Sequence, residues 1–420
     1  MRPVIQLRPH QHRALDALAK YLKGQVVMPT ASGKTNIAIF DALREFEKDT
    51  PQTIVVVAPR IMLANQLSSE FLEHISNVAV MHVHSGETHH FNSTKPFEIQ
   101  MWDSIVSGAF NPDAPKHKLI FTTYNSLQRL QQADIHVNTI YFDEAHNSVK
   151  RNFFPATQHF SITANRCYFF TATPKHSATI SKPGMNDGSV YGQVICNVPA
   201  PELVEGGFIV PPQIMVNQVN CDRDKDHAAE RDCMTLLDTI LNENNMQKVL
   251  VAAPNTKVLI RMLAETDFMS EVQSYGYDVL WVTAKYGAFI NNQKVSREVF
   301  FDTLTAWGKD PDKKFIILHY SILSEGINCP GLTSCVLMRN MDYIAMAQTI
   351  GRVIRLHPDD SKRLSEGTLT PGKTEDYVKS YGFIHVPVYN NVGIATAKRL
   401  QNVAETIFVQ GNPAISVIKR

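Results

Sequence analysis

The chain lacks the features of a membrane-bound, exported or disulfide-stabilised protein. Its 420 residues include only 6 cysteines, none in a Cys-x-x-Cys pair or near histidine at zinc-binding spacing. No uncharged apolar run reaches the roughly 18 residues that a membrane span needs. The first residues show no apolar leader segment. From these absences we expect reduced thiols in a soluble, intracellular protein.

Strong net charge is also missing, since 41 Lys+Arg face 40 Asp+Glu and the formal net charge is +1. Any nucleic-acid surface must therefore be a local groove and not a global basic field. With 44% hydrophobic and 19% charged residues, the chain can bury substantial cores, and its length exceeds that of one ordinary domain. We expect two globular domains.

Short apolar runs alternate with helix-like stretches twice along the chain. The expected strands of the first half are Gln25–Met28, Thr53–Ala58, Ala79–Val83, Lys118–Thr122, Thr139–Phe142 and Cys167–Phe170, with helices at Thr35–Glu47 and Ile61–His74. In the second half the strands are Lys248–Ala252, Asp278–Val282, Phe315–Leu318 and Cys335–Met338, with helices at Glu230–Asn244, Thr256–Glu265, Asn292–Ala306 and Tyr343–Gly351. A further strand at 381–388 and a helix at 394–408 follow. This rhythm predicts an α/β fold with two largely parallel, doubly wound sheets.

Proline and glycine concentrate in one segment, 182–212, which we interpret as the domain boundary. The expected domains are 1–205 and 206–420. Two other Gly- and Pro-containing stretches, 91–116 and 357–374, are interpreted as surface loops or insertions.

A phosphate-binding loop is predicted where a strand ends at Met28 and a helix begins with Gly33-Lys34-Thr35. Such a turn surrounds a polyphosphate with backbone amides and a helix N-terminus. Lys34 would reach the β/γ-phosphates, and the Thr35 hydroxyl would bind Mg²⁺. The predicted nucleotide contacts are Thr30, Ala31, Ser32, Gly33, Lys34 and Thr35. Met28 replaces the first glycine of the full motif, so an ordinary turn with a solvated lysine is the alternative.

Two adjacent carboxylates, Asp143 and Glu144, follow the strand Thr139–Phe142. They would lie at the carboxyl end of the sheet, where doubly wound folds bind ligands. We expect Asp143 to hold Mg²⁺ and Glu144 to orient or deprotonate the attacking water. A helix N-cap with two dipole-stabilised acids is the alternative.

Gln348, Arg352 and Arg355 are spaced i, i+4 and i+7, which places them on one helical face. We predict that they act on a phosphate as catalytic groups together with Lys34 and Glu144, because guanidinium groups grip phosphate through paired hydrogen bonds. A solvated basic stripe is the alternative.

A histidine cluster occurs near Gly86. Its members are His82, His84, His89 and His90. Because they lack a cysteine partner and helical His-x-x-x-His spacing, we interpret them as surface or nucleic-acid-facing residues and not as a metal site.

Over nearly its whole length the chain resembles superfamily 2 helicases and translocases. Leu7-Arg8-Pro9-His10-Gln11 and the Asp-Glu-Ala-His box at 143–146 favour the type III restriction enzyme and phage or repair helicase branch over the DEAD-box branch. The resemblance implies two tandem RecA-like domains with a cleft for ATP and nucleic acid between them. It also implies ATP and Mg²⁺ as cofactors.

The resemblance further implies roles for individual residues. Gln11 would read the adenine, and Gly326 would belong to a motif that contacts both ligands. The residues that couple the ATP site to strand movement would be His146, Thr171 and Thr173. The nucleic-acid contacts would be Pro59, Arg60, Thr123, Asn255 and Ser324. The chain departs from the family after the strand 278–282, where Thr283-Ala284-Lys285 replaces a Gly-containing sequence.

The implied function is an ATP-dependent helicase or translocase, with DNA favoured over RNA as the nucleic acid. We expect a monomer whose substrate preference comes from surface loops or from protein partners. Three alternatives stay open: a duplex translocase or annealing factor that does not unwind, a nucleic-acid-stimulated ATPase switch, and an RNA helicase.

Overall fold

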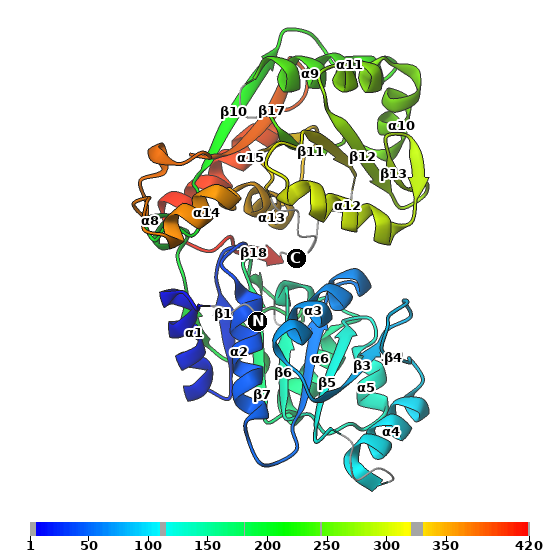
Figure 1. Ribbon diagram of the computed structural model, residues 1–420, viewed down its shortest axis with the longest axis vertical. Coiled ribbons are helices and arrows are strands. Elements are labelled where there is room, and N and C mark those ends of the chain that lie inside the picture. The colour runs from blue at the N-terminus through cyan, green and yellow to red at the C-terminus, as the bar shows by residue number, and fades with distance from the viewer. Residues whose placement is uncertain (1–5, 110–114, 180, 244–245, 321–330, 419–420) are drawn as a thin grey trace. The chain divides into compact units, whose positions relative to one another are not determined.

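The computed structural model describes residues 6–109, 115–179, 181–243, 246–320 and 331–418. The chain divides into two compact units (Figure 1). The first comprises Met1–Pro29, Gly33–Val198 and Ile415–Arg420, and the second Thr30–Ser32 and Pro199–Ala414.

The first unit is built on an eight-stranded sheet of order β4-β3-β5-β2-β6-β7-β1-β9, in which the described pairs are parallel. Its strands are β1 Lys23–Val27, β2 Thr53–Ala58, β3 Val78–Val83, β4 Phe91–Asn92, β5 His117–Thr123, β6 Thr139–Phe142, β7 Arg166–Thr171 and β9 Val194–Asn197. Its helices are α1 Pro9–Lys20, α2 Lys34–Phe46, α3 Ile61–His74, α4 Pro96–Ser104, α5 Leu127–Gln132, α6 Phe154–Thr163 and α7 Gly188–Tyr191.

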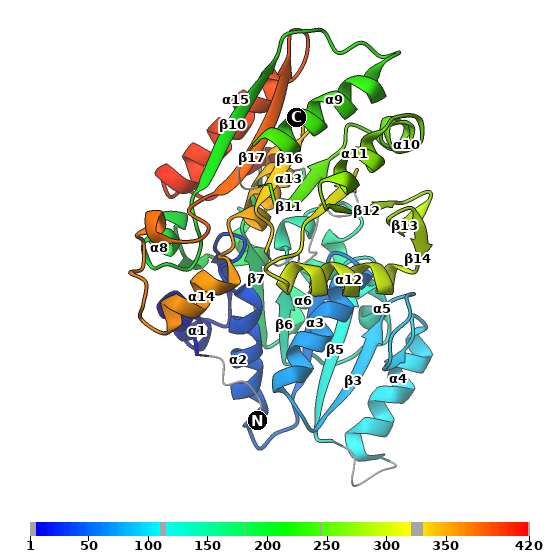
Figure 2. The ribbon, with the colours of Figure 1, turned by 45° about the horizontal axis from the view of Figure 1, so that its top comes forward.

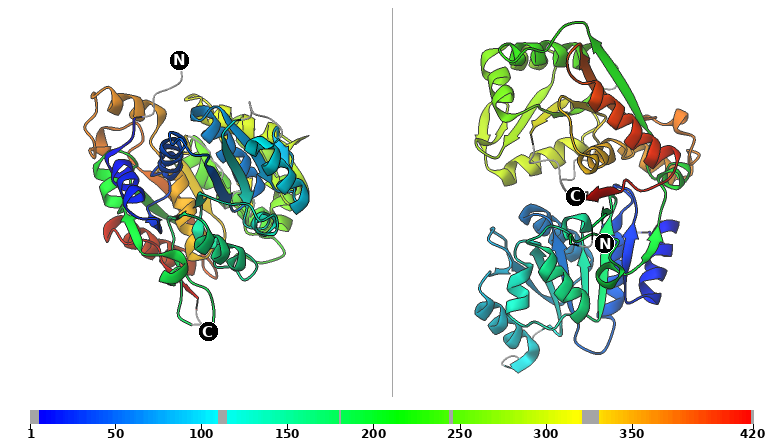
Figure 3. Two further views of the ribbon diagram at one scale, coloured as in Figure 1. Left: turned by 90° about the horizontal axis from the view of Figure 1, so that it is seen from below. Right: turned by 180° about the vertical axis from the view of Figure 1, so that it is seen from behind.

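The strand order of this unit reverses after β3, which sends helices to both faces of the sheet. Right-handed crossovers place α2 and α3 on one face and α4, α5 and α6 on the other. Figure 3 shows the helices around the sheet from two further sides. Because both faces are covered, a central strand such as β2 is buried over its full length. The carboxyl ends of these strands therefore form the edge that is open to ligands.

The second unit holds another eight-stranded sheet, of order β10-β17-β16-β11-β15-β12-β13-β14. Its strands are β10 Pro212–Val219, β11 Lys248–Ala252, β12 Asp278–Thr283, β13 Gly287–Ile290, β14 Gln293–Val295, β15 Phe315–His319, β16 Ser334–Leu337 and β17 Gly382–Tyr389. Its helices are α8 Ala200–Glu205, α9 Ala228–Asn242, α10 Thr256–Glu265, α11 Phe268–Ser274, α12 Arg297–Lys309, α13 Tyr343–Val353, α14 Pro358–Ser365 and α15 Ile394–Ala404. The sheet is parallel from β10 to β12 and antiparallel from β12 to β14.

The chain crosses back to the first unit near its end. There β18 (Ser416–Ile418) pairs in parallel with β8 (Lys175–Ser177). The Ser416 amide donates to the Pro174 carbonyl at 3.0 Å. The end of the chain thus lies beside the segment that follows Thr171 and Thr173, and Figure 3 draws it as the red arrow.

Most predicted elements are confirmed, but one helix is wrong at its start. The stretch expected as helix Asn292–Ala306 opens with strand β14, and α12 begins only at Arg297. Ser296 caps this helix, since its Oγ accepts from the Val299 amide at 3.1 Å. The two expected loops are also wrong in part, because 91–116 contains α4 and 357–374 contains α14. Each of these helices begins with a proline, which is favoured at the first helical position.

The described part of the chain contains no helix long and apolar enough to cross a membrane. Within the same residues no group of histidine, cysteine or acidic side chains is arranged to hold a metal ion.

Candidate nucleotide and nucleic-acid sites

The phosphate loop has the backbone that its sequence predicts. Gly33 lies in the left-handed region at φ 80°, and Ala31 does so as well, at φ 70°. A Cβ atom on Gly33 would come within 2.2 Å of Gln11 Nε2, so a side chain there would displace Gln11. The Lys34 ammonium donates to the carbonyls of Met28 and Pro29, each at 3.3 Å. The lysine therefore folds back over the loop.

Gln11 lies against this loop and not at the surface. Its Nε2 donates to the Gly33 carbonyl at 3.1 Å, and its Oε1 accepts from the Arg8 amide at 2.9 Å. The side chain is buried. Gln11 thus ties the start of α1 to the phosphate loop, and its role in reading adenine stays a prediction.

Asp143 and Glu144 follow β6 at the carboxyl edge of the sheet. The Tyr124 hydroxyl donates to the Asp143 carbonyl at 2.7 Å, and the Asp143 amide donates to the Val57 carbonyl at 2.9 Å. Tyr124 directly follows Thr123, a predicted nucleic-acid contact at the end of β5, so this segment is bonded directly to the acidic motif. The sequence does not predict this link, because it does not reveal which way a buried tyrosine points.

Glu144 occupies an unusual environment. Its backbone is left-handed at φ 46°, which is costly for a residue other than glycine. Its Oε2 is buried without a hydrogen bond to any residue that the structure describes, and it lies 3.5 Å from His146 Nδ1. Strain and unmet hydrogen bonding together are typical of a catalytic position.

The electrostatics of this pair fit a divalent cation. Burial, and then the Glu144 carboxylate, raise the pKa of Asp143 to about 7, whereas Lys34 opposes the shift. A small cavity is lined by Lys34, Thr35 and Asp143 together with apolar side chains of α2, α3 and the sheet. Carboxylate and hydroxyl oxygens are ligands that Mg²⁺ prefers, and a cation would offset the repulsion between the two acids.

The three predicted coupling residues lie together. His146 Nδ1 is 3.1 Å from Thr171 Oγ1 and 3.2 Å from Thr173 Oγ1. The other ring nitrogen, Nε2, is 3.2 Å from Asn147 Nδ2. All three predicted residues are buried. The acidic motif after β6 is therefore joined to the Thr-Ala-Thr motif after β7 through one imidazole.

A buried ion-pair network supports the other end of the sheet, and sequence reasoning missed it. Arg166 donates to both carboxylate oxygens of Asp41 at 2.9 Å and contacts Glu45 at 2.9 Å. The Tyr141 hydroxyl donates to Asp41 at 2.7 Å. Since 125 residues separate Asp41 from Arg166, no local pattern could have revealed the pair.

In the second unit, α13 carries two of the three predicted phosphate-binding groups. Gln348 and Arg352 are both buried, with exposed fractions of 5% and 6%. Gln348 Nε2 has no hydrogen-bond partner in the described part of the chain. The expectation that Arg355 shares this helical face is wrong, because α13 ends at Val353 and Arg355 forms an isolated β-bridge with Ile209.

His319, at the end of β15, is a second site residue that the sequence analysis missed. It is 2% exposed, and neither ring nitrogen forms a hydrogen bond with the residues that the structure describes. Burial, followed by the charges of Arg352 and Arg339, lowers the pKa of His319 to about 3. The ring is therefore neutral near physiological pH and lies in the field of the predicted catalytic arginine. A polar residue closing an otherwise apolar strand was the available signal.

The predicted nucleic-acid contacts are placed at strand ends. Pro59 and Arg60 follow β2, and Arg60 is the N-cap of α3. Thr123 is only 3% exposed. Asn255 caps α10, since its Oδ1 accepts from the Val258 amide at 2.9 Å. The remaining predicted residues, Ser324 and Gly326, lie outside the described residues.

The interpretation of His82 and His84 as surface residues is wrong. Their exposed fractions are 0% and 1%, and His82 Nδ1 lies 2.9 Å from His84 Nε2. Ser68 Oγ and Asn65 Oδ1 complete the contacts at 3.0 and 3.1 Å. The two histidines lie at and just beyond the end of β3, where their side chains turn inward. Burial lowers the pKa of His82 to about 3.

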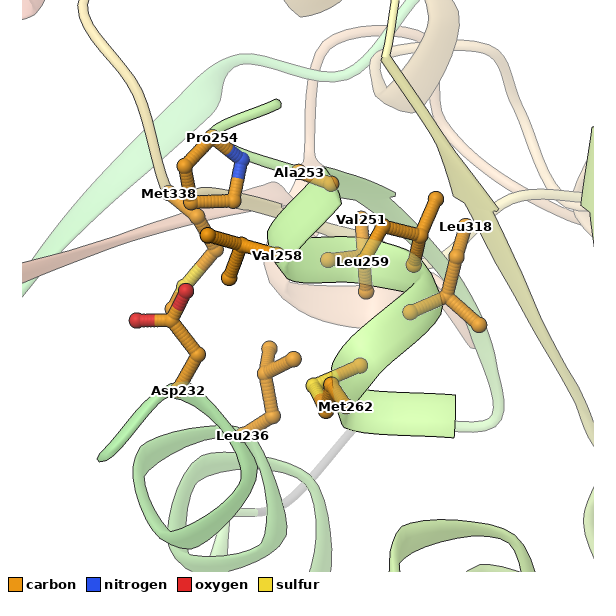
Figure 4. A pocket seen from close by; sticks show the side chains of 10 residues that line it. All are labelled: Asp232, Leu236, Val251, Ala253, Pro254, Val258, Leu259, Met262, Leu318 and Met338. Atoms are coloured by element: carbon orange, nitrogen blue, oxygen red, sulfur yellow. The ribbon is translucent and has the colours of Figure 1, made fainter. Parts of the chain in front are cut away.

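A separate pocket in the second unit is mainly apolar, and its one charged lining side chain is already paired (Figure 4). Its ten lining residues include one charged side chain, Asp232. That carboxylate is already bound by Arg223 at 2.6 and 2.8 Å. The pocket is therefore a packing gap between α9, α10 and the sheet.

Comparisons with known proteins agree with this arrangement. The family described as "Type III restriction enzyme, res subunit" matches residues 4–176. Nothing matches among the curated proteins.

Solved structures of similar fold extend over the whole chain. The type ISP restriction-modification enzyme LlaBIII bound to DNA has a TM-score of 0.73 at 15% identity, with 99% of this chain and 31% of that chain covered. A nuclease-deletion mutant of the related enzyme LlaGI, in complex with a DNA substrate mimic, gives 0.66 at 18% identity, with 98% and 30% covered. Dbp5 of S. cerevisiae, bound to RNA and ADP BeF3, gives 0.58 at 14% identity, with 97% and 89% covered.

At these identities the similarity is one of fold, and this chain spans about three tenths of the length of the two restriction-modification enzymes. The predicted pair of RecA-like α/β units is confirmed, as is the resemblance to superfamily 2 helicases. The assignment to the DEAH subtype stays a prediction.

Proposed function

We propose that this chain is an ATP-dependent nucleic-acid helicase or translocase. The observation that carries the proposal is the arrangement of the predicted motifs in the first unit. Lys34 and Thr35 line one cavity with Asp143, and the neighbouring Glu144 contacts His146, which in turn contacts Thr171 and Thr173. A chain that only bound nucleotide would not need His146 to link the acidic motif to Thr171 and Thr173, at and just after the end of β7.

ATP is the proposed substrate and Mg²⁺ the proposed metal. Thr35 and Asp143 would hold the cation, which neutralises developing phosphate charge when bound. Lys34 would leave the carbonyls that it now contacts and bind the phosphates. Glu144 would accept the proton of the attacking water, and its buried, unbonded Oε2 supports this role.

Residues 206–420 are proposed as the helicase C-terminal domain, and 1–205 as the ATP-binding domain. Gln348, Arg352 and Arg355 are assigned to the same hydrolysis reaction, because arginine stabilises transition-state charge on a transferring phosphoryl group. Arg355 would act from beyond the end of α13, not from its face.

Nucleic acid is the proposed partner, and DNA is favoured over RNA. The restriction-enzyme family match and the DNA-bound restriction-modification structures support DNA, whereas the RNA-bound Dbp5 supports RNA as the alternative. An intracellular, monomeric protein is part of the same proposal.

Strand-displacement assays on DNA and RNA duplexes, run beside ATPase measurements, test the proposal. We expect nucleic acid to stimulate ATP hydrolysis and one duplex class to be unwound. Stimulation without displacement would favour a duplex translocase, an annealing factor or an ATPase switch. ATP hydrolysis that is indifferent to every DNA and RNA would contradict the proposal.

A further inference from the structure

The second sheet ends in a hairpin whose second strand, β14, occupies the start of the predicted helix Asn292–Ala306. Strands β12, β13 and β14 form an antiparallel meander at the sheet edge, which Figure 2 shows beside α12. Strand β13 turns into β14 through Asn291 and Asn292 at φ 44° and 66°. Two successive left-handed residues make a type I′ turn, whose twist matches that of the flanking strands.

The hairpin is held rigidly against β12. Asn291 Oδ1 accepts from the Val279 amide at 2.8 Å, and the Asn291 amide donates to the Val279 carbonyl at 2.8 Å. The Trp281 and Phe289 rings stack with their centroids 3.8 Å apart. A hairpin pinned at its base and along its face presents its opposite tip in a fixed position.

That tip is the three-residue turn Ala284-Lys285-Tyr286 between β12 and β13. It lies at the carboxyl end of β12, the same edge at which β11 and β15 end, because these three strands are parallel. Asn255 follows β11 at this edge. Ligands of doubly wound sheets bind there.

The side chains of the tip combine an exposed aromatic ring with positive charge. Tyr286 is 40% exposed, and the Lys285 ammonium lies 5.2 Å from the centre of its ring. The Lys294 stem passes close to Gly287, at 3.6 Å from where a Cβ would stand. From 279 to 297 the chain has Lys285, Lys294 and Arg297 but no acidic residue. Neither lysine forms an ion pair within the described residues.

We propose that this tip is a single-stranded nucleic-acid contact, in which Tyr286 stacks on a base and Lys285 binds an adjacent phosphate. The inference rests on the proposed function and adds a site to it. Aromatic stacking with flanking cations is how proteins hold single strands without reading sequence. An acidic protein segment would use the lysines but would have no need of an exposed ring beside them.

The chain supplies matched controls at the opposite end of the same strands. Tyr275 is 57% exposed and precedes β12, and Lys314 precedes β15 with its ammonium 5.6 Å from the Tyr277 ring. Both lie at the amino edge of the sheet. Tyr275→Ala and Lys314→Ala therefore remove an exposed aromatic ring and a lysine ammonium from the amino edge of the sheet, where no nucleic-acid contact is proposed.

The test is fluorescence anisotropy of the full chain with labelled single-stranded DNA and RNA oligonucleotides over a range of salt concentrations. Tyr286→Ala should weaken binding about 5- to 150-fold, the range found for losing one stacked base, whereas Tyr286→Phe should bind like the unchanged chain. Lys285→Ala should reduce the slope of log affinity against log salt by about 0.7. Unchanged thermal unfolding of each variant establishes that it is folded.

Unaltered binding in Tyr286→Ala, or equal losses in Tyr286→Ala and Tyr275→Ala, would overturn the inference and leave the proposed function standing. If Lys285→Ala weakened oligonucleotide binding and Tyr286→Ala did not, the stacking role of Tyr286 would likewise be excluded. Dependence on charge alone is what a site for an acidic protein segment would show. Failure of the proposed function has a different signature, because then the unchanged chain itself would bind neither oligonucleotide.

Discussion

The two units each bury a histidine near the residues predicted to act on ATP, but the two histidines differ in their hydrogen bonding. In the first unit both ring nitrogens of His146 have polar neighbours, namely Thr171, Thr173 and Asn147. In the described part of the second unit, both nitrogens of His319 lack a hydrogen bond, and so does Nε2 of Gln348. A buried polar group left unbonded costs about 1–3 kcal/mol.

Among the buried polar groups near the proposed chemistry, His146 thus finds its partners within the first unit, whereas the described residues of the second unit leave His319 and Gln348 Nε2 unsatisfied. Glu144, the residue proposed to meet water, also has an unbonded Oε2 among the described residues, as do Gln25 Oε1 and Thr139 Oγ1 elsewhere in the first unit.

The largest expected effect comes from the second unit. Arg352→Ala should lower the rate of ATP hydrolysis by about 10³- to 10⁵-fold, because an arginine that stabilises transition-state charge contributes that much. Nucleotide binding should persist, since Gly33, Lys34 and Thr35 of the phosphate loop are in the first unit. Steady-state turnover and equilibrium binding of an ATP analogue measure the two effects separately.

The exposed Arg363 on α14 provides the control, and Arg363→Ala should leave turnover unchanged. Near-normal ATP hydrolysis by a folded Arg352→Ala chain would show that Arg352, and with it the second unit, does not contribute to the reaction as proposed.

The next largest effect concerns stability in the first unit. Arg166→Ala should lower the free energy of unfolding by about 3–5 kcal/mol, because it leaves the buried Asp41 carboxylate without its bidentate partner. Arg44 contacts the same carboxylate from a position that is 36% exposed, so Arg44→Ala should cost no more than about 1 kcal/mol. Urea unfolding of both variants measures the difference, and equal losses would show that burial of the pair does not matter.

A smaller, pH-dependent effect tests His319. Its pKa is about 3 in the folded chain and about 6.5 when unfolded, so the unfolded state binds more protons between these values. Its contribution to stability is therefore full above pH 6.5 and falls as the pH is lowered. His319→Leu should gain about 1.4 kcal/mol relative to the unchanged chain when the pH goes from 7.5 to 5.5. A difference between the two proteins that is independent of pH would contradict a neutral, buried His319.

The sequence was sufficient for the parallel strands and for the motifs at their ends. Strands covered on both faces are continuous apolar runs, so Thr53–Ala58, Thr139–Phe142 and Lys248–Ala252 have the bounds that their composition predicts. The placement of Lys34, Thr35 and Asp143 around one cavity follows, since the carboxyl ends of parallel strands share one edge.

Other features depended on contacts that the sequence does not encode locally. The pairing of Arg166 with Asp41, the burial of His82 and His84, and the link from Tyr124 to Asp143 all arise between distant elements. The error at Asn292–Ala306 is different in kind. Asn291-Asn292 was a hairpin signal, but the strands on either side of it are only four and three residues long.

The central claim is that ATP binding and nucleic-acid binding are coupled in this chain, so that each ligand changes the affinity for the other. Affinity of the unchanged chain for single-stranded DNA and RNA, measured with and without a non-hydrolysable ATP analogue, tests it directly. We predict a change of about 5- to 150-fold for at least one of the two, and by reciprocity the same factor in nucleotide affinity. Identical affinities in the two nucleotide states, for both DNA and RNA, would contradict the account.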